Sequence, residues 1–140
     1  MYDELRLFVT GAVREFHIRV YMLDPDDDRI PWLLRRLPAL EALVLSETLL
    51  PSGSLSALAK EPILCHSLKI VAFFDCPVTE HTIKELEWMQ AKRRDSTATR
   101  LYRVVIVNNT HSLPDLQLIH QLRKFAPRVD IGVGKLPDLL

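Results

Sequence analysis

The sequence predicts an α/β protein, a short and open leucine-rich-repeat solenoid of about five strand–helix units with a parallel sheet on its concave face. Three observations lead to this prediction. Apolar residues recur on a leucine-rich-repeat spacing, short segments of alternating apolar residues are separated by segments of helical period, and 140 residues suffice for one core. We therefore expect residues 1–140 to form a single leucine-rich-repeat-like domain.

The repeats are clearest in the middle of the chain. Segment 37–50, LPALEALVLSETLL, fits the spacing L-x-x-L-x-x-L-x-L-x-x-(N/C/T)-x-L, and segments that begin at Cys65 and Leu101 follow the same frame. Weaker copies lie around residues 18–20 and 129–131. Because an alternating apolar pair marks a short strand, strands are expected near 16–22, 42–46, 69–74, 103–107 and 129–133. The second apolar position of each strand should align across the sheet: Val20, Leu45, Phe73, Ile106 and Ile131.

A small polar or thiol residue follows three of these strands. Thr48, Cys76 and Asn109 occupy this position, and their side chains are expected to bond backbone groups left unpaired where the strands end.

Segments of helical period separate the strands. Thr79 is the expected cap of a helix with Ile83, Leu86 and Met89 on its inner face. Ser112 is the expected cap of the next helix, whose inner residues would be Leu116, Ile119 and Leu122. Shorter helices are expected at 2–9, 29–36 and 54–60.

Composition narrows the classes of partner. The 18 basic and 18 acidic residues balance, so neither nucleic acid nor an anionic membrane is an expected partner. Cys65 and Cys76 are too few for a secreted disulfide framework. Acidic residues near Met1 do not suit a signal peptide, and no apolar run approaches the ~20 residues that span a bilayer. We therefore expect a cytoplasmic or nuclear protein.

Four segments together resemble the carboxy-terminal leucine-rich-repeat region of fungal, especially basidiomycete, F-box proteins: LPALEALVLSETLL, CHSLKIVAFFDCPVTEHTIKEL, LYRVVIVNN and RVDIGVGKLP. In that family an F-box docks to the adaptor of an SCF-type cullin-RING ubiquitin ligase, and the repeat region binds the protein to be ubiquitinated. The resemblance implies a protein–protein interaction module that recognises a ligase substrate. The sequence carries no F-box, so docking to the adaptor is implied only if an F-box is supplied.

The outward positions of the strands form the predicted binding surface. Its centre is apolar and its edges are charged, a composition that favours contact with another protein. The alternative is that a helix, a terminus or a second copy of the chain covers this face. The candidate binding residues are Arg19, Tyr21, Val44, Ile70, Phe74, Arg103, Val105 and Val107.

Motifs for metals and phosphate are incomplete. The acidic run 24–28 lacks the glycine and glutamate of a calcium loop, and Cys65, His66, Cys76 and His81 match no usual zinc spacing. IGVGK at 131–135 lacks the following helix of a phosphate loop, and the cations at 92–94 suit a solvated helix end. No metal and no cofactor are expected.

Two alternatives to the interaction module remain. One is a small α/β enzyme whose site follows the strand ending at Val107, where Asn108, Asn109 and His111 lie. No nucleophile, base and orienting group occur together, so no catalytic residue is assigned and an enzyme is not expected. The other is a non-functional repeat fragment that self-associates through uncapped solenoid ends.

Overall fold

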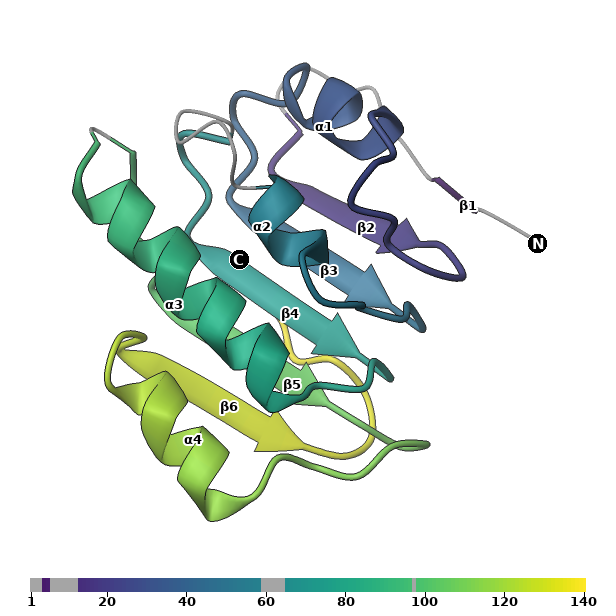
Figure 1. Ribbon diagram of the computed structural model, residues 1–140, viewed down its shortest axis with the longest axis vertical. Coiled ribbons are helices and arrows are strands. Elements are labelled where there is room, and N and C mark those ends of the chain that lie inside the picture. The colour runs from purple at the N-terminus through teal and green to yellow at the C-terminus, as the bar shows by residue number, and fades with distance from the viewer. Residues whose placement is uncertain (1–3, 6–12, 59–64, 97) are drawn as a thin grey trace.

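The computed structural model describes residues 4–5, 13–58, 65–96 and 98–140, which form six strands and four helices (Figure 1). In chain order these are β1 (Glu4–Leu5), β2 (Glu15–Arg19), α1 (Arg29–Leu34), β3 (Ala42–Ser46), α2 (Ser54–Leu58), β4 (Ile70–Phe74), α3 (Glu80–Arg94), β5 (Arg103–Val107), α4 (Leu116–Arg123) and β6 (Arg128–Gly132).

The strands form one sheet in chain order, β1 to β6, with β2 to β6 parallel. This is the α/β class with a parallel sheet that the sequence predicts. Strands β3 and β5 occupy the predicted residues, while β4 and β6 begin within one residue of the prediction. The helix expected at 2–9 is wrong at Glu4 and Leu5, which pair antiparallel with β2 as strand β1. The rest of that expected helix lies outside the described residues.

The alignment predicted for the first repeat is also wrong, by two residues. Ile18, and not Val20, pairs with Leu45, and the remaining register Leu45, Phe73, Ile106 and Ile131 is as predicted. Because side chains alternate with a period of two along a strand, a two-residue shift keeps the same face inward. The sequence therefore predicts which face of the sheet each β2 side chain lies on, but not which residue of β3 it lies beside.

All four helices lie on one face of the sheet, as Figure 1 shows. The inward side chains of the strands and those of the helices share one large hydrophobic cluster there. Its fully buried members include Ile18, Leu45, Phe73, Ile83, Leu86 and Leu122. Each helix thus covers the strands beside it, as expected for repeated strand–helix units that cannot bury their apolar faces alone.

The strand ends repeat one hydrogen-bond pattern. The N–H groups of Glu47 and Asp75 donate to the last carbonyl of the next strand, at 2.8 Å each, and Asn108 does the same at 3.1 Å. Glu47 and Asp75 both adopt positive φ, 50° and 53°, so the chain turns in the same way in both units. The side chains that follow act as expected. Thr48 Oγ1 donates to the Ser46 carbonyl at 2.8 Å, and Cys76 Sγ donates to the Leu45 carbonyl at 3.1 Å.

Among the buried polar side chains of α3, Gln90 and Arg93 bond the backbone of distant segments. Gln90 donates to the carbonyls of Leu101 and Phe125 and accepts from the Leu101 N–H. Arg93 is only 4% exposed and donates to the carbonyls of Cys65, Leu68 and Thr99, among others. The solvated helix end expected at 92–94 is therefore wrong for Arg93, because its guanidinium supplies hydrogen bonds that these loop carbonyls need.

Helix α4 begins later than the sequence suggested. Its N-cap is Asp115, whose carboxylate accepts from the Leu118 N–H at 2.9 Å, and not Ser112. Leu116 then falls on the outer side and is 83% exposed, although it was expected to point inward. Leu122 is buried as expected.

Candidate functional site

The eight predicted binding residues divide into two groups. Arg19 and Tyr21 are exposed and Phe74 is partly buried, whereas the other five lie beneath the surface. The buried members are Val44, Ile70, Arg103, Val105 and Val107, all at 5% exposure or less. The exposed apolar centre expected on this sheet face is therefore wrong, and the alternative of a covered face is correct for β3 to β5.

The cover is segment 133–140, which leaves β6 and turns back behind the sheet (Figure 1). Leu136 and Leu139 pack against a second hydrophobic cluster on the face opposite the helices. The cluster consists of Val44, Ala72, Val105 and Val107, with Phe74 at its margin. Sequence reasoning missed this contact because the leucines of LPDLL belong to no repeat and carry no periodic signal.

Polar contacts fix the path of segment 133–140. The Asn109 side chain donates to the Gly134 carbonyl at 2.9 Å and accepts from the Gly134 N–H at 2.7 Å. Gly134 has φ +100°, which favours glycine, so IGVGK encodes a turn here. Arg103 then donates to the Asp138 carbonyl at 3.0 Å while pairing with the Asp130 carboxylate at 2.6 Å.

An apolar surface stays exposed at the carboxyl ends of β2 and β3. It consists of Tyr21, Met22 and Leu49, which are 57%, 39% and 38% exposed. Backbone bonds join the two connections: the Leu49 N–H donates to the Tyr21 carbonyl at 3.1 Å, and the Leu23 N–H donates to the Leu49 carbonyl at 3.0 Å. We call these three residues the strand-end patch. Its backbone is held in place, so its side chains are displayed on an ordered support.

Charges border the strand-end patch. Arg19 pairs with Glu47 at 2.5 Å, across the ends of β2 and β3. The patch therefore has an apolar centre and a charged edge, the arrangement usual in protein–protein interfaces.

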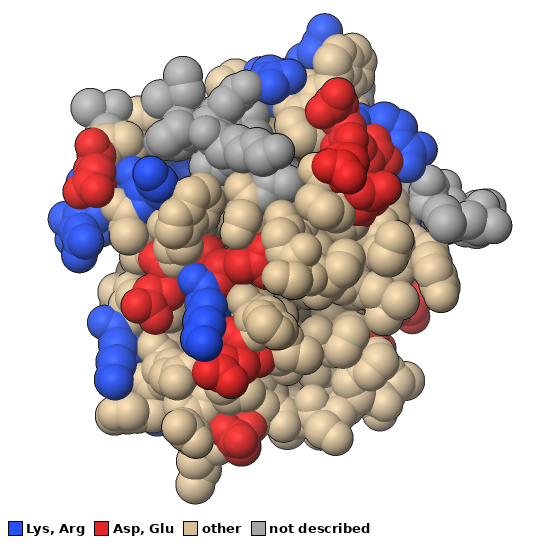
Figure 2. All heavy atoms as spheres, viewed as in Figure 1, with Lys and Arg blue, Asp and Glu red and all other residues tan. Residues whose placement is uncertain are grey.

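On the helix face, cations lie beside the two exposed tryptophans. Trp32 and Trp88 are partly exposed, but the Arg36 guanidinium lies 3.7 Å from the ring centre of Trp32, and the Lys92 ammonium lies 5.5 Å from that of Trp88. Figure 2 shows acidic and basic side chains mixed across this face. The mixture creates no large field of one sign that would favour a polyanion.

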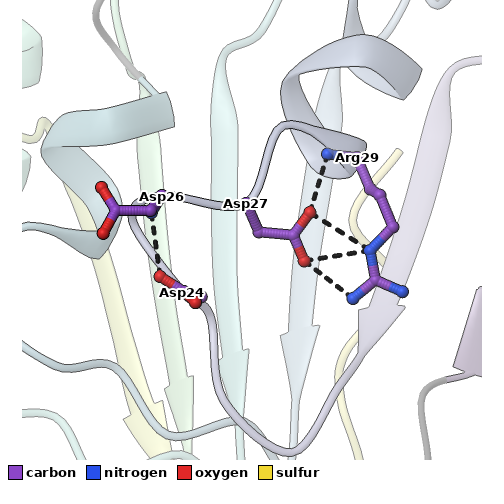
Figure 3. A network of polar contacts seen from close by, with 4 residues as sticks. All are labelled: Asp24, Asp26, Asp27 and Arg29. Atoms are coloured by element: carbon purple, nitrogen blue, oxygen red, sulfur yellow. Dashed lines mark hydrogen bonds and ion pairs between the residues drawn. The ribbon is translucent and has the colours of Figure 1, made fainter.

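Two carboxylates of the acidic run 24–28 accept hydrogen bonds from nearby residues, as Figure 3 shows. The Asp24 carboxylate accepts from the Asp26 N–H at 2.9 Å. The Asp27 carboxylate accepts from the Arg29 side chain, at 2.7 Å from Nη2, and this contact lowers the pKa of Asp27. Across the described ranges, no three His, Cys, Asp or Glu side chains come together as a metal site would require.

The two thiols are structural. Cys65 and Cys76 are buried and free, and burial raises the pKa of each to about 11. A thiol with a raised pKa is a poor nucleophile and a poor metal ligand at neutral pH.

An ion cluster lies at the amino ends of β3 and β4. Glu41 pairs with Arg14 and, at 3.1 Å, with Lys69, beside an open depression of about 560 Å³ that Ser67 and Thr99 also line. Hydrogen bonds from Arg14 and then Lys69 lower the pKa of Glu41 to about 2. Two cations and one carboxylate leave one net positive charge at the depression, and both cations already contact the carboxylate.

Two of the three residues of the enzyme alternative, Asn108 and Asn109, form hydrogen bonds with the backbone. The Asn109 side-chain amide forms hydrogen bonds with both the N–H and the carbonyl of Gly134. The Asn108 amide nitrogen donates to the Ser112 carbonyl at 3.3 Å. His111 is exposed on the same connection. Within the described residues, Asn108 Oδ1 is the buried side-chain polar atom left without a hydrogen-bond partner, and it does not by itself define a reaction.

Comparisons with protein-family models, with curated proteins and with solved structures found no match. Across the part of the chain that the structure describes, no helix has the length and apolar character needed to cross a bilayer.

Proposed function

We propose that the chain is a leucine-rich-repeat module that binds another protein and selects it as a substrate for an SCF-type cullin-RING ubiquitin ligase. Docking to the adaptor would need an F-box, which this sequence does not carry. The binding energy would come from contact with the partner, and the chemistry would take place elsewhere on the ligase.

Repetition of the units supports the proposal. Successive strand–helix units share a sheet register and a turn geometry after β3 and β4, and both turn residues adopt positive φ. Stacked units of this kind display connections at regular intervals along one edge, where they suit the binding of extended surfaces.

The strand-end patch is the single observation that carries the proposal. Tyr21 and Leu49 lie on neighbouring connections joined by backbone bonds and expose apolar area beside the Arg19–Glu47 pair. Ordered aromatic and aliphatic side chains with a charged border are typical anchors of protein interfaces. Two of the predicted binding residues, Arg19 and Tyr21, belong to this surface or its edge.

The test is ubiquitination by a chimeric receptor. The chain is fused behind an F-box and the fusion is expressed in cells. Diglycine-remnant mass spectrometry then identifies the proteins whose ubiquitination requires the fusion. The patch variant combines Tyr21→Ser and Leu49→Ser. The control variant is Leu116→Ser on α4, which changes an apolar residue that is more exposed than either of them.

The patch variant should lower ubiquitination of the captured protein at least about tenfold, which corresponds to ~1.4 kcal/mol of binding free energy. Leu116→Ser should leave it unchanged. Equal activity of both variants would place the recognition surface elsewhere, and a fusion that modifies no protein would favour the non-functional fragment. Far-UV circular dichroism verifies that each variant remains folded.

A further inference from the structure

The sheet face between β3 and β5 has the features of a peptide-binding groove, and segment 133–140 occupies it. The floor is the apolar cluster Val44, Ala72, Val105 and Val107. On the neighbouring strand β2 this face is exposed: His17, which is level with Val44 in the sheet register, is 46% exposed. Over β3 to β5, Leu136 and Leu139 of the segment pack against the floor.

Most of the polar contacts in the groove are made to main-chain atoms of the segment. Asn109 forms two hydrogen bonds with the backbone of Gly134, in the manner of a neighbouring strand. Arg103, held by Asp130, donates to the carbonyl of Asp138. Contacts of this type recognise any peptide that follows the same path, because they do not depend on its side chains.

Only three positions of the segment depend on residue type. Gly134 has positive φ, and Leu136 and Leu139 supply the apolar contacts. Val133, Lys135 and Asp138 have exposed side chains, so other residues would fit there equally well. The groove therefore selects glycine, which adopts positive φ without strain, followed by apolar residues two and five positions later.

We propose that this groove binds an extended segment of a partner protein with that pattern, and that segment 133–140 closes the groove until the partner displaces it. The inference deepens the proposed function and rests on it, since it names the kind of segment a partner would offer.

Displacement is physically accessible because it breaks a small set of contacts, the hydrogen bonds from Asn109 and Arg103 and the packing of two leucines. Leu136 and Leu139 are only partly buried, and the segment adds neither helix nor strand to the fold. A second copy of the chain is a poorer occupant than a foreign segment. The segment of a second copy is identical to the resident segment and gains no contact over it. The resident segment is tethered to the sheet, which keeps it at an effective concentration of about millimolar.

The first experiment measures whether the groove accepts a peptide in trans. The probe is a fluorescein-labelled synthetic peptide with the sequence of residues 131–140, and its binding to the full chain is followed by fluorescence anisotropy. The variant Leu136→Ser with Leu139→Ser frees the groove and should bind the probe at least about tenfold more tightly than the wild type. Adding Asn109→Ala should weaken that binding again.

Matched controls separate the groove from general stickiness. Val133→Ser with Leu140→Ser changes exposed apolar residues of the same segment and should bind the probe like the wild type. A probe with both leucines replaced by serine should not bind to any variant. Failure of the freed and folded variant to bind the unmodified probe would overturn the proposal.

The second experiment measures whether foreign segments displace the resident one. Ten-residue peptides displayed on phage are selected on the wild-type chain. The selected peptides should carry the Gly-x-apolar-x-x-apolar pattern and should bind Asn109→Ala at least about tenfold more weakly. If the selected peptides lack the pattern, or if Asn109→Ala does not weaken their binding, the segment is a permanent part of the core. If the wild type forms a concentration-dependent dimer, and the double variant Leu136→Ser, Leu139→Ser does not, a second copy of the chain is the occupant. Either result overturns the proposal.

These outcomes are separable from those of the chimeric receptor. Loss of peptide binding alone removes the groove and leaves the strand-end patch as the recognition surface. Loss of ubiquitination alone removes the ligase role and leaves the groove.

Discussion

Gln90 and Arg93 lie three residues apart on α3, and each serves several backbone groups. Gln90 bonds both polar groups of Leu101, and Arg93 bonds carbonyls on the connections before β4 and β5. A buried carbonyl without a partner is unfavourable, so one side chain that serves several carbonyls stabilises two connections at once.

Replacing Arg93 tests this role. Arg93→Ala should lower the free energy of unfolding by roughly 3 kcal/mol or more, because several buried carbonyls lose a charged donor. The neighbouring exposed Arg94→Ala should change it by less than about 0.5 kcal/mol. Urea unfolding followed by circular dichroism measures both. Equal stability of the two variants would contradict the role of Arg93.

Glu41 couples stability to pH. Its pKa in the folded protein is about 2, below the ordinary value of 4.5, because Arg14 and then Lys69 donate hydrogen bonds to the carboxylate. A lowered pKa means that the ionised carboxylate stabilises the fold. The stabilisation is complete above pH 4.5 and is lost as the pH falls towards 2.

Glu41→Gln should remove this pH dependence. The wild type should exceed the variant in stability at pH 6, and the difference should shrink as the pH falls from about 4.5 to about 2. Urea midpoints measured across this range give the result, with Glu87→Gln on the outer side of α3 as the control. A difference that is constant with pH would show that Glu41 acts through its shape and not its charge.

At the scale of the element, a tertiary contact supplies a hydrogen-bond acceptor to the first turn of helix α2. The Glu85 carboxylate on α3 accepts hydrogen bonds from the N–H and hydroxyl of Ser56 on α2, at 3.1 and 3.0 Å. Such a contact places a negative charge beside the first turn of the short helix, where the dipole favours it. Helix α4 instead uses its own residue, Asp115.

The position of the α4 cap is testable. Asp115→Ala should lower the free energy of unfolding by about 1 kcal/mol, because the Leu118 N–H loses its acceptor. Ser112→Ala, at the cap first expected from the sequence, should have almost no effect. Thermal unfolding of the two variants distinguishes the positions, and a larger effect at Ser112 would return the cap to that residue.

At the scale of the whole molecule, the two faces of the sheet are covered differently. Four helices cover one face, and segment 133–140 packs against side chains of β3, β4 and β5 on the other. The same row of the sheet therefore contains an exposed residue, His17, and a fully buried one, Val105.

The same substitution at these two positions measures the cover. Val105→Asn should lower the free energy of unfolding by roughly 3 kcal/mol, because it removes buried apolar area and buries an amide without a partner. His17→Asn should change it by less than about 0.5 kcal/mol. Chemical denaturation compares them, and a harmless Val105→Asn would mean that the segment does not cover β5 in solution.

The sequence alone determined the alternation of strands and helices and the inward face of every parallel strand. Apolar periods of two and of three to four residues are local signals, and the inward residues Leu45, Phe73 and Ile106 follow from them. The turn positions Thr48 and Cys76 were likewise predictable, because a small polar or thiol residue recurs at the same place after a strand. Of the candidate binding residues, Arg19 and Tyr21 are exposed as expected, whereas binding itself stays a prediction.

Tertiary structure decided which surfaces remain free. Whether Val105 is exposed depends on the path of Leu136 and Leu139, about thirty residues further along the chain, and no local pattern records that contact. The burial of Arg93 depends in the same way on carbonyls from distant connections. Periodicity reports which face of an element is apolar, but only the packed chain determines what lies against that face.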